Sequence, residues 1–273
     1  MSTPSRVAVA SVVSLWRYPV KSMMGEELNA SVMTERGLLG DRAFAVVDSS
    51  TGKVASAKEP RKWAKLFDFR AAYIGPPGDG GLPPVRITLP DGTVVTSEES
   101  DLDQTFARVL DREVVFATSA PDAPSLEEYW PDIEGLAHQE AVTDETMAPG
   151  TFFDSAVVHL LTTATIDRLG TLYPEGRFEV RRFRPNIVVR TEDGDGFVEN
   201  EWVGRTLALG GEVRLNITKP CSRCVMTTLP QGDLPKDPGI LRAAAAHNEA
   251  NVGIYASVIR GGMVRRGDAV WLE

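Results

Sequence analysis

Cysteine and histidine are scarce in this chain. Its 273 residues include two cysteines, Cys221 and Cys224, and three histidines, His138, His159 and His247. Two cysteines exclude the set of several disulfides that holds small secreted domains together. A structural zinc site normally takes four Cys or His ligands, and these histidines show no ligand spacing, so we do not expect one.

Long hydrophobic runs and an excess of positive charge are also missing. The longest uncharged run near the N-terminus spans 7–16, far short of the ~20 residues of a membrane-spanning helix, and no cleavage-site pattern follows it. The chain has 29 Lys and Arg against 38 Asp and Glu, a net charge of −9, whereas a large nucleic-acid interface normally needs a basic surface. We therefore expect a cytoplasmic protein that binds neither membranes nor nucleic acids.

Several common enzyme motifs are absent as well. The sequence has no G-x-G-x-x-G after a strand, no G-x-x-x-x-G-K-[ST] and no G-x-S-x-G, so it offers no dinucleotide fingerprint, P-loop or nucleophile elbow. No segment of 20–50 residues repeats, which excludes solenoids and propellers.

Short β-branched or alternating segments, separated by turn residues, dominate the chain and predict many short strands. Two pairs flank turn residues and predict hairpins, 44–47 with 53–57 and 85–89 with 93–96. Further strands are expected at 7–16, 113–117, 156–161, 186–189, 212–217, 253–259 and 269–272. Helices are expected only at about 100–111, 165–173 and 240–248. The fold class is therefore mixed but β-rich (α+β), with barrel-like β architecture and few short helices.

Positive charge is concentrated in parts of this acidic chain. Residues 177–190 carry five arginines against one glutamate. Other cations lie beside turns or strand ends, at Lys21, Arg42, Lys58, Arg61, Lys219 and Arg223. Guanidinium groups bind phosphate and carboxylate in a planar fork, and ammonium groups act as point charges. The clusters indicate a small anionic ligand, although solvated arginines on strand faces would give the same pattern.

The segment Pro220-Cys221-Ser222-Arg223-Cys224 directly follows a predicted strand, and three interpretations compete for it. A thioredoxin-like redox pair would need a helix start in a βαβ unit, which these strand-rich surroundings do not resemble. Two buried, inert cysteines are the second interpretation. The third is one thiolate bound to a single metal, with Ser222 and Arg223 holding an anionic cofactor, because an arginine beside a thiol lowers its pKa.

Motifs spread in order over nearly the whole chain resemble a known family. Tyr18-Pro19-Val20-Lys21-Ser22 and Gly37-Leu38-Leu39-Gly40-Asp41-Arg42 are similar to the β-barrel domain that accompanies MOSC domains. The runs 183–189 (FRPNIVV) and 221–228 (CSRCVMTT) resemble the MOSC domain itself, named for the molybdenum cofactor sulfurase C-terminus, and 266–270 is similar to its closing strand. The resemblance implies an N-terminal MOSC β-barrel domain at 7–118, a connecting segment at 119–144 and a MOSC domain at 145–273.

By these motifs the chain is similar to the mitochondrial amidoxime reducing components and their bacterial counterparts, which bind a molybdopterin-type molybdenum cofactor. The resemblance makes Cys224 the molybdenum ligand and catalytic residue, and leaves Cys221 without an assigned role. It implies cofactor contacts at Lys21, Ser22, Arg42, Arg184, Asn186, Ser222 and Arg223, with a looser match at Thr162 and Thr163.

The function implied by the resemblance is that of a molybdenum-dependent oxidoreductase that reduces N-hydroxylated small molecules. The sequence shows no ferredoxin-like extension after the closing strand, so we expect electrons from a separate ferredoxin- or cytochrome b5-like donor protein. No lysine stands out as a Schiff-base former, and we do not expect pyridoxal phosphate. Two alternatives remain open: a carrier of molybdenum cofactor or sulfur without turnover of its own, and a scaffold that has lost the cofactor.

Overall fold

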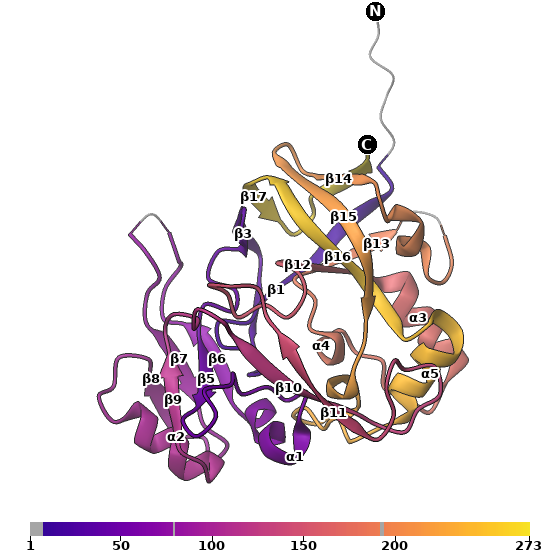
Figure 1. Cartoon of the computed structure of the whole chain (residues 1–273). Coiled ribbons are helices and arrows are strands. Elements are labelled where there is room, and N and C mark those ends of the chain that lie inside the picture. Colours follow the sequence, from indigo (N-terminus) through magenta and orange to yellow (C-terminus); the bar gives the residue numbers. More distant parts are fainter. Residues whose placement is uncertain (1–7, 79, 192–193) are drawn as a thin grey trace, which may run out of the picture.

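The computed structural model describes residues 8–78, 80–191 and 194–273 (Figure 1). Within these residues the chain forms 18 strands, five α-helices and three 3₁₀ helices. The predicted class, β-rich with few short helices, is thus confirmed. Val7, the first residue of the predicted N-terminal strand and domain, lies outside the described residues.

Seven strands close into a barrel in the order β13-β12-β16-β15-β14-β18-β1, because β1 also pairs with β13. They are β1 (Ala10–Arg17), β12 (Val158–Thr162), β13 (Ile187–Thr191), β14 (Thr206–Leu209), β15 (Val213–Ser222), β16 (Asn251–Arg260) and β18 (Ala269–Leu272). The short β2 (Glu26–Leu28) adds to β1 outside the ring. Closure leaves no unpaired edge among these strands, which is the usual advantage of a barrel.

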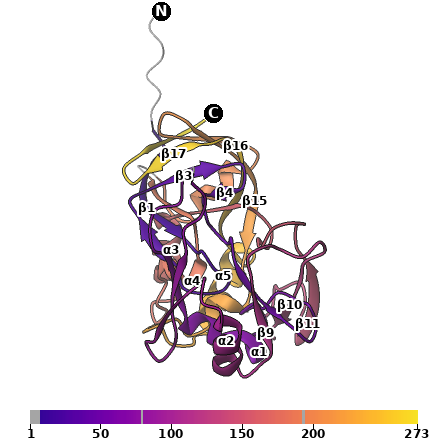
Figure 2. The ribbon, with the colours of Figure 1, turned by 90° about the vertical axis from the view of Figure 1, so that its left-hand side faces the viewer.

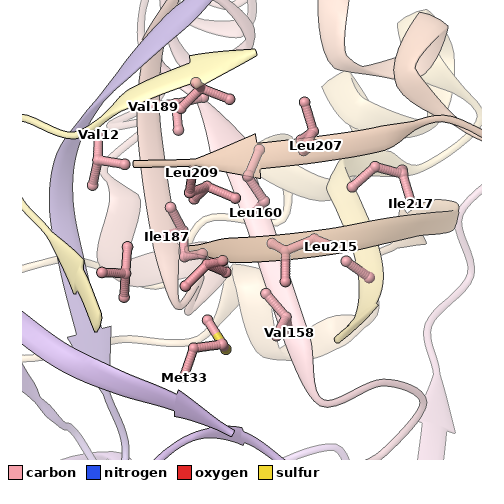
Figure 3. Close-up of a cluster of buried hydrophobic side chains, with 14 of the residues drawn as sticks. Val12, Met33, Val158, Leu160, Ile187, Val189, Leu207, Leu209, Leu215 and Ile217 are labelled. Atoms are coloured by element: carbon pink, nitrogen blue, oxygen red, sulfur yellow. The ribbon is translucent and has the colours of Figure 1, made fainter. Parts of the chain in front are cut away.

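The barrel interior is filled by side chains from alternate positions of its strands. Leu207 and Leu209 of β14, Leu215 of the neighbouring β15 and Leu160 of β12 belong to one cluster of fully buried side chains (Figure 3). Successive side chains of a strand point to opposite faces, so residues two apart, such as Leu207 and Leu209, both point into the barrel. The barrel is therefore a packed core and not a channel.

Three small sheets are formed mainly by the N-terminal half, one packing on the barrel core and the other two on a second core. One joins β3 (Ala30–Thr34), β4 (Gly37–Leu38) and β17 (Gly262–Arg265), the second pairs β5 (Ala45–Asp48) with β9 (Val114–Ala117), and the third holds β6 (Arg70–Tyr73), β7 (Val85–Thr88) and β8 (Val94–Thr96). Figure 2 shows β17 and β3 side by side at the top of the molecule. The second core is built from Phe69, Phe106, Phe116 and aliphatic neighbours.

Of the two predicted hairpins, one forms with a full ladder and the other only as a short pairing around its turn. Strands β7 and β8 pair as expected. The strand β5 pairs with 53–55 through the Val47–Val54 bridge and two backbone hydrogen bonds, Asp48 N–H to the Lys53 carbonyl and Ala55 N–H to the Val46 carbonyl. Its other edge pairs along its whole length with the distant β9, a partner that the sequence did not predict.

Three of the five α-helices lie where the sequence predicted helices, and the two four-residue helices were not predicted. They are α1 (Pro60–Trp63), α2 (Leu102–Leu110), α3 (Thr163–Leu172), α4 (Val180–Phe183) and α5 (Gly239–Asn248), with 3₁₀ helices η1 (Ala64–Asp68), η2 (Val198–Trp202) and η3 (Val225–Thr228). The helix α3 begins two residues earlier than predicted, because Thr162 Oγ1 accepts the backbone N–H of Thr165 and caps it.

The segment 119–144, expected as a connection without regular structure, contributes to a β-hairpin of β10 (Ser125–Trp130) and β11 (Ala141–Thr146). In Figure 1 it crosses the lower middle of the molecule, between the N-terminal sheets and α5. The strand β1 of the predicted first domain belongs to the barrel of the predicted second domain. The domain boundaries themselves stay a prediction.

Candidate functional site

A pocket of about 450 Å³ opens where the barrel meets the N-terminal half and the β10–β11 hairpin. Eight of the ten site residues expected from the sequence line it. They are Lys21, Ser22, Arg42, Arg184, Asn186, Ser222, Arg223 and Cys224. These residues come from four separate stretches of the chain, which the fold brings together at one pocket.

Three of these residues have an unusual backbone. Ser22, Arg42 and Arg184 have φ values of 61°, 47° and 53°, in the left-handed region that residues with a Cβ rarely occupy. Each such residue costs free energy, which the surrounding fold offsets. Strained residues cluster at binding sites, and Glu249 and Ala250, with φ values of 50° and 59°, bring the number that line this pocket to five.

The Lys21 end of the pocket is a network of buried charges. The Lys21 ammonium donates to the Phe152 carbonyl oxygen at 2.9 Å and to the Asp154 carboxylate. Lys58 Nζ lies 2.9 Å from Glu128 Oε2 and 3.9 Å from Asp154 Oδ2. Burial alone would raise the pKa of Asp154, but the two ammonium groups hold it well below its usual value. Burial lowers the pKa of Lys21 although Asp154 opposes this, whereas Asp154, Cys224 and Glu128 outweigh burial at Lys58 and raise its pKa.

Arg42 and Arg184 are held by the turn that follows β1. Asp41 accepts the backbone N–H of Tyr18 at 2.7 Å and Asn186 Nδ2 at 3.0 Å, and it pairs with Arg42. Arg184 donates to the Met23 carbonyl at 2.8 Å, and its guanidinium lies 4.2 Å from the centre of the Tyr18 ring. Burial lowers the pKa of Arg184 to about 10, which still leaves it cationic at neutral pH.

The two cysteines lie at different depths. Strand β15 continues through Pro220 to Ser222, which buries Cys221 completely. Cys224 follows in extended backbone just before η3, is half-buried and lines the pocket. Arg223 lies between them, with Nη1 2.8 Å from Cys221 Sγ and Nη2 donating to the Phe183 carbonyl at 2.8 Å.

The thiols also differ in acidity. For Cys221, burial opposes ionisation, but Arg223 and His159 outweigh it and lower the pKa to about 6. For Cys224, burial, reinforced by Glu128, raises the pKa to about 11. With no metal bound, Cys221 is the thiolate and Cys224 the neutral thiol at pH 7. A cationic metal on Cys224 would reverse that preference, since coordination deprotonates a thiol.

The donor set at the pocket fits an anionic cofactor with one thiolate-bound metal. Two buried polar atoms of this region, Arg223 Nε and the Tyr18 hydroxyl, have no hydrogen-bond partner. Such groups are costly unless a ligand satisfies them. Arg223 lines the pocket and Tyr18 lies under Arg184. No group of three or more metal-binding side chains occurs among the described residues. A metal in this pocket would therefore take most of its ligands from the cofactor itself, with the Cys224 thiol as the candidate protein ligand.

The structure does not bring Thr162 and Thr163 into the pocket. Thr162 is fully buried, caps α3 and shares the Glu199 carboxylate with Thr165, each hydroxyl 2.7 Å from Oε2. It lies three residues along β12 from His159, which does line the pocket, and three residues of strand span about 10 Å. A cofactor role for these two threonines stays a prediction.

Several pocket residues were not assigned to a site from the sequence. Asp154 and Ser155 line the pocket just before β12, and Lys58 was noted only as a cation. His159, interpreted as a core or strand residue, is indeed buried but also reaches the pocket, with Nε2 3.1 Å from the Val252 carbonyl. A carboxylate directly after the apolar pair Phe152-Phe153 was the one local signal for Asp154.

Comparison with known domains defines the class of protein. Residues 148–271 match the MOSC domain and residues 9–74 match the MOSC N-terminal beta barrel domain. The chain therefore belongs to the proteins in which a MOSC N-terminal beta barrel domain precedes a MOSC domain. Among the described residues, every helix is too short or too polar to span a bilayer.

Individual relatives are distant. Mitochondrial amidoxime reducing component 2 of Rattus norvegicus is 25% identical, over 96% of this chain and 83% of its own. Mitochondrial amidoxime-reducing component 1 of Homo sapiens is 26% identical, over 81% of this chain and 66% of its own. The solved structure of the YUAD protein from Bacillus subtilis shares the fold, with a TM-score of 0.50 at 13% identity, covering 98% of this chain and 97% of that one.

Proposed function

We propose that this chain is a molybdenum-cofactor-dependent oxidoreductase that reduces N-hydroxylated small molecules. The observation that carries the proposal is the pocket itself, in which the half-buried thiol of Cys224 faces cations from three other stretches of the chain. The similarity to the amidoxime reducing components supports the same reaction class. A cytoplasmic location is part of the proposal.

Each part of the pocket has a role in this proposal. Lys21, Arg42 and Arg184 bind the phosphate end of the cofactor and its surroundings, Asn186 and Ser222 hydrogen-bond its polar ring system, and Arg223 satisfies its free Nε there. Cys224 supplies the thiolate that binds the molybdenum. When bound, the cofactor supplies the two-electron chemistry, and the protein supplies position and electrostatics.

The overall reaction takes two electrons and two protons. It breaks the N–O bond of the substrate, leaves the nitrogen with a hydrogen and releases the oxygen as water. The electrons come from a separate donor protein of the ferredoxin or cytochrome b5 type. The ammonium of Lys58, paired with Glu128 and Asp154, keeps a proton in the same pocket as Cys224.

The test is molybdenum per chain, by elemental analysis, in wild type, Cys224→Ala and Cys221→Ala from a host that makes the cofactor. We expect nearly one molybdenum in wild type, none in Cys224→Ala and most of it in Cys221→Ala, with amidoxime reduction following the metal when a donor is supplied. Metal retained in Cys224→Ala would refute the ligand assignment. Metal bound in wild type without any reduction would favour the carrier alternative, and no metal at all would favour the sulfur carrier or the scaffold.

A further inference from the structure

One face of the β10–β11 hairpin forms a wall of the pocket. Leu126, Glu128 and Trp130 alternate along β10 and all line the pocket, as does Glu145, which pairs with Leu126 across the hairpin. Side chains two apart on a strand share a face. The intervening Glu127 points the other way, toward Lys53 and Lys62.

The hairpin is fixed at both ends, so its inner face has a defined place. At one end Lys53 and Lys62 bind Glu127, and Lys58 binds Glu128. At the other end the connecting loop packs Ile133 and Leu136 on Leu241 of α5 and on Ala250. The hairpin thus bridges the N-terminal half and α5 beside the pocket.

The chemistry of this wall differs from that of the pocket floor. The floor holds deeply buried polar and cationic groups such as Lys21, Arg184 and Asn186. The wall presents the half-buried indole of Trp130, held by its Nε1–H donating to Thr143 Oγ1 at 2.8 Å and by the edge of the His138 ring. Glu145, also at the pocket, accepts a hydrogen bond from Thr143 Oγ1 at 2.7 Å, and neither it nor Glu249 forms an ion pair among the described residues.

Charge at the pocket depends on what occupies the floor. Five cationic side chains and four carboxylates line it in total. An anionic cofactor bound to the floor cations would offset their charge, which would leave Glu145 and Glu249 as uncompensated charges at the mouth. An aromatic face next to such carboxylates attracts flat cations and repels anions.

We propose that the inner face of β10–β11, with Trp130 and Glu145, selects flat neutral or cationic N-hydroxylated substrates of the amidoxime type and discriminates against anionic ones. This rests on the proposed function. The amidine product of such a reduction is a stronger base than its parent and takes up a proton at neutral pH. The wall therefore recognises the flat group of the substrate and the charge that appears in the product.

The test uses cofactor-loaded protein and three benzamidoximes that carry a para aminomethyl group, no substituent or a para carboxylate. We expect the carboxylate to have the lowest kcat/KM. In Glu145→Gln the ratio of aminomethyl to carboxylate should fall about 3-fold, as for a partly exposed charge pair. Asp144→Asn, which removes a neighbouring charge from the opposite face, should leave the ratio unchanged.

Trp130 is tested with the same series. Trp130→Leu should raise KM for all three compounds, by roughly 3- to 10-fold for the cationic one, and Trp130→Phe should restore much of it because it keeps an aromatic face. A ratio that is the same in wild type, Glu145→Gln and Asp144→Asn, with turnover intact, overturns the inference and leaves the proposed function standing.

Calorimetry of benzamidine and benzoate binding to the same proteins distinguishes failure of the proposed function from failure of the selective wall. Benzamidine bound in preference to benzoate, weakened by Glu145→Gln and with no reduction of any benzamidoxime, would refute the proposed function while supporting the selective wall. Equal binding of the two probes would refute the wall.

Discussion

The buried Cys221 thiol is paired with Arg223 at the pocket, and this pairing changes the pKa of the thiol. Cys221 is fully buried with Arg223 Nη1 2.8 Å from its sulfur. Its pKa of about 6 lies below the ordinary value of 9.0. A group whose pKa is lower in the folded state stabilises that state above its unfolded pKa, and the benefit is lost as pH falls through the folded pKa.

We therefore expect the metal-free protein to become more stable as pH rises from 6 to 9, by at most ~4 kcal/mol from this thiol. Urea unfolding at pH 6, 7, 8 and 9 measures the free energy of unfolding. Cys221→Ser is the comparison, since a serine hydroxyl does not ionise in this range. The gap between wild type and variant should widen with pH, and a constant gap would contradict a buried thiolate.

The difference between the two cysteines could not be predicted from spacing. The sequence identified the segment and its chemistry, because cysteine, arginine and serine there are unusual neighbours. Which thiol is buried depends on how far β15 continues, and the apolar pattern predicted a strand only over 212–217. The strand runs through Pro220 to Ser222 with irregular pairing to β16, and this shift places Cys221 inside and Cys224 at the pocket.

At the scale of elements, the junction of β12 and α3 is held by hydroxyl groups around one carboxyl. Thr162 caps the helix and, with Thr165, donates to Glu199, whose pKa burial raises. Thr162→Ala removes the cap and one donor to a buried acceptor. We expect a loss of ~2 kcal/mol of unfolding free energy, with molybdenum content unchanged.

Thr162→Ser keeps the hydroxyl and should recover most of that loss. Chemical denaturation measures the stability of both variants, and elemental analysis measures their metal. If Thr162→Ala instead loses metal at nearly unchanged stability, the threonine contacts the cofactor after all, as the sequence resemblance implied.

The β10–β11 hairpin was missed from the sequence for a physical reason. A half-buried strand is recognised by alternating apolar and polar residues, but the inner face of β10 carries Glu128 between Leu126 and Trp130. The acid is there because Lys58 pairs with it. By contrast, α2 shows Leu102, Phe106 and Leu110 on one buried face, and was predicted within two residues at each end.

At the scale of the whole molecule, the two predicted domains share a sheet. The strand β1 lies between β13 and β18, and β17 near the C-terminus pairs with β3. We expect residues 119–273 alone to fail to fold cooperatively, since β13 and β18 would each lose a neighbour and Val12 and Leu15 would leave the core.

Co-expression with residues 1–118 should restore a soluble complex. Near-ultraviolet circular dichroism and thermal unfolding of the fragment, the reconstituted pair and the intact chain measure this. A sharp thermal transition in the isolated 119–273 fragment would show that the barrel tolerates the gap, and would support two separable domains.

The position of β1 in the ring also constrains the order of events as the ribosome makes the chain. Synthesis completes β1 at residue 17, yet its neighbours in the barrel end only at residues 191 and 272. Lys21 and Arg42 are therefore synthesised early, and Cys224 is added to the chain only some 180 residues after Arg42. A nascent chain released before β18 has the pocket residues without a closed ring to hold them, so under the proposed function a cofactor would be loaded only after β18 has been made.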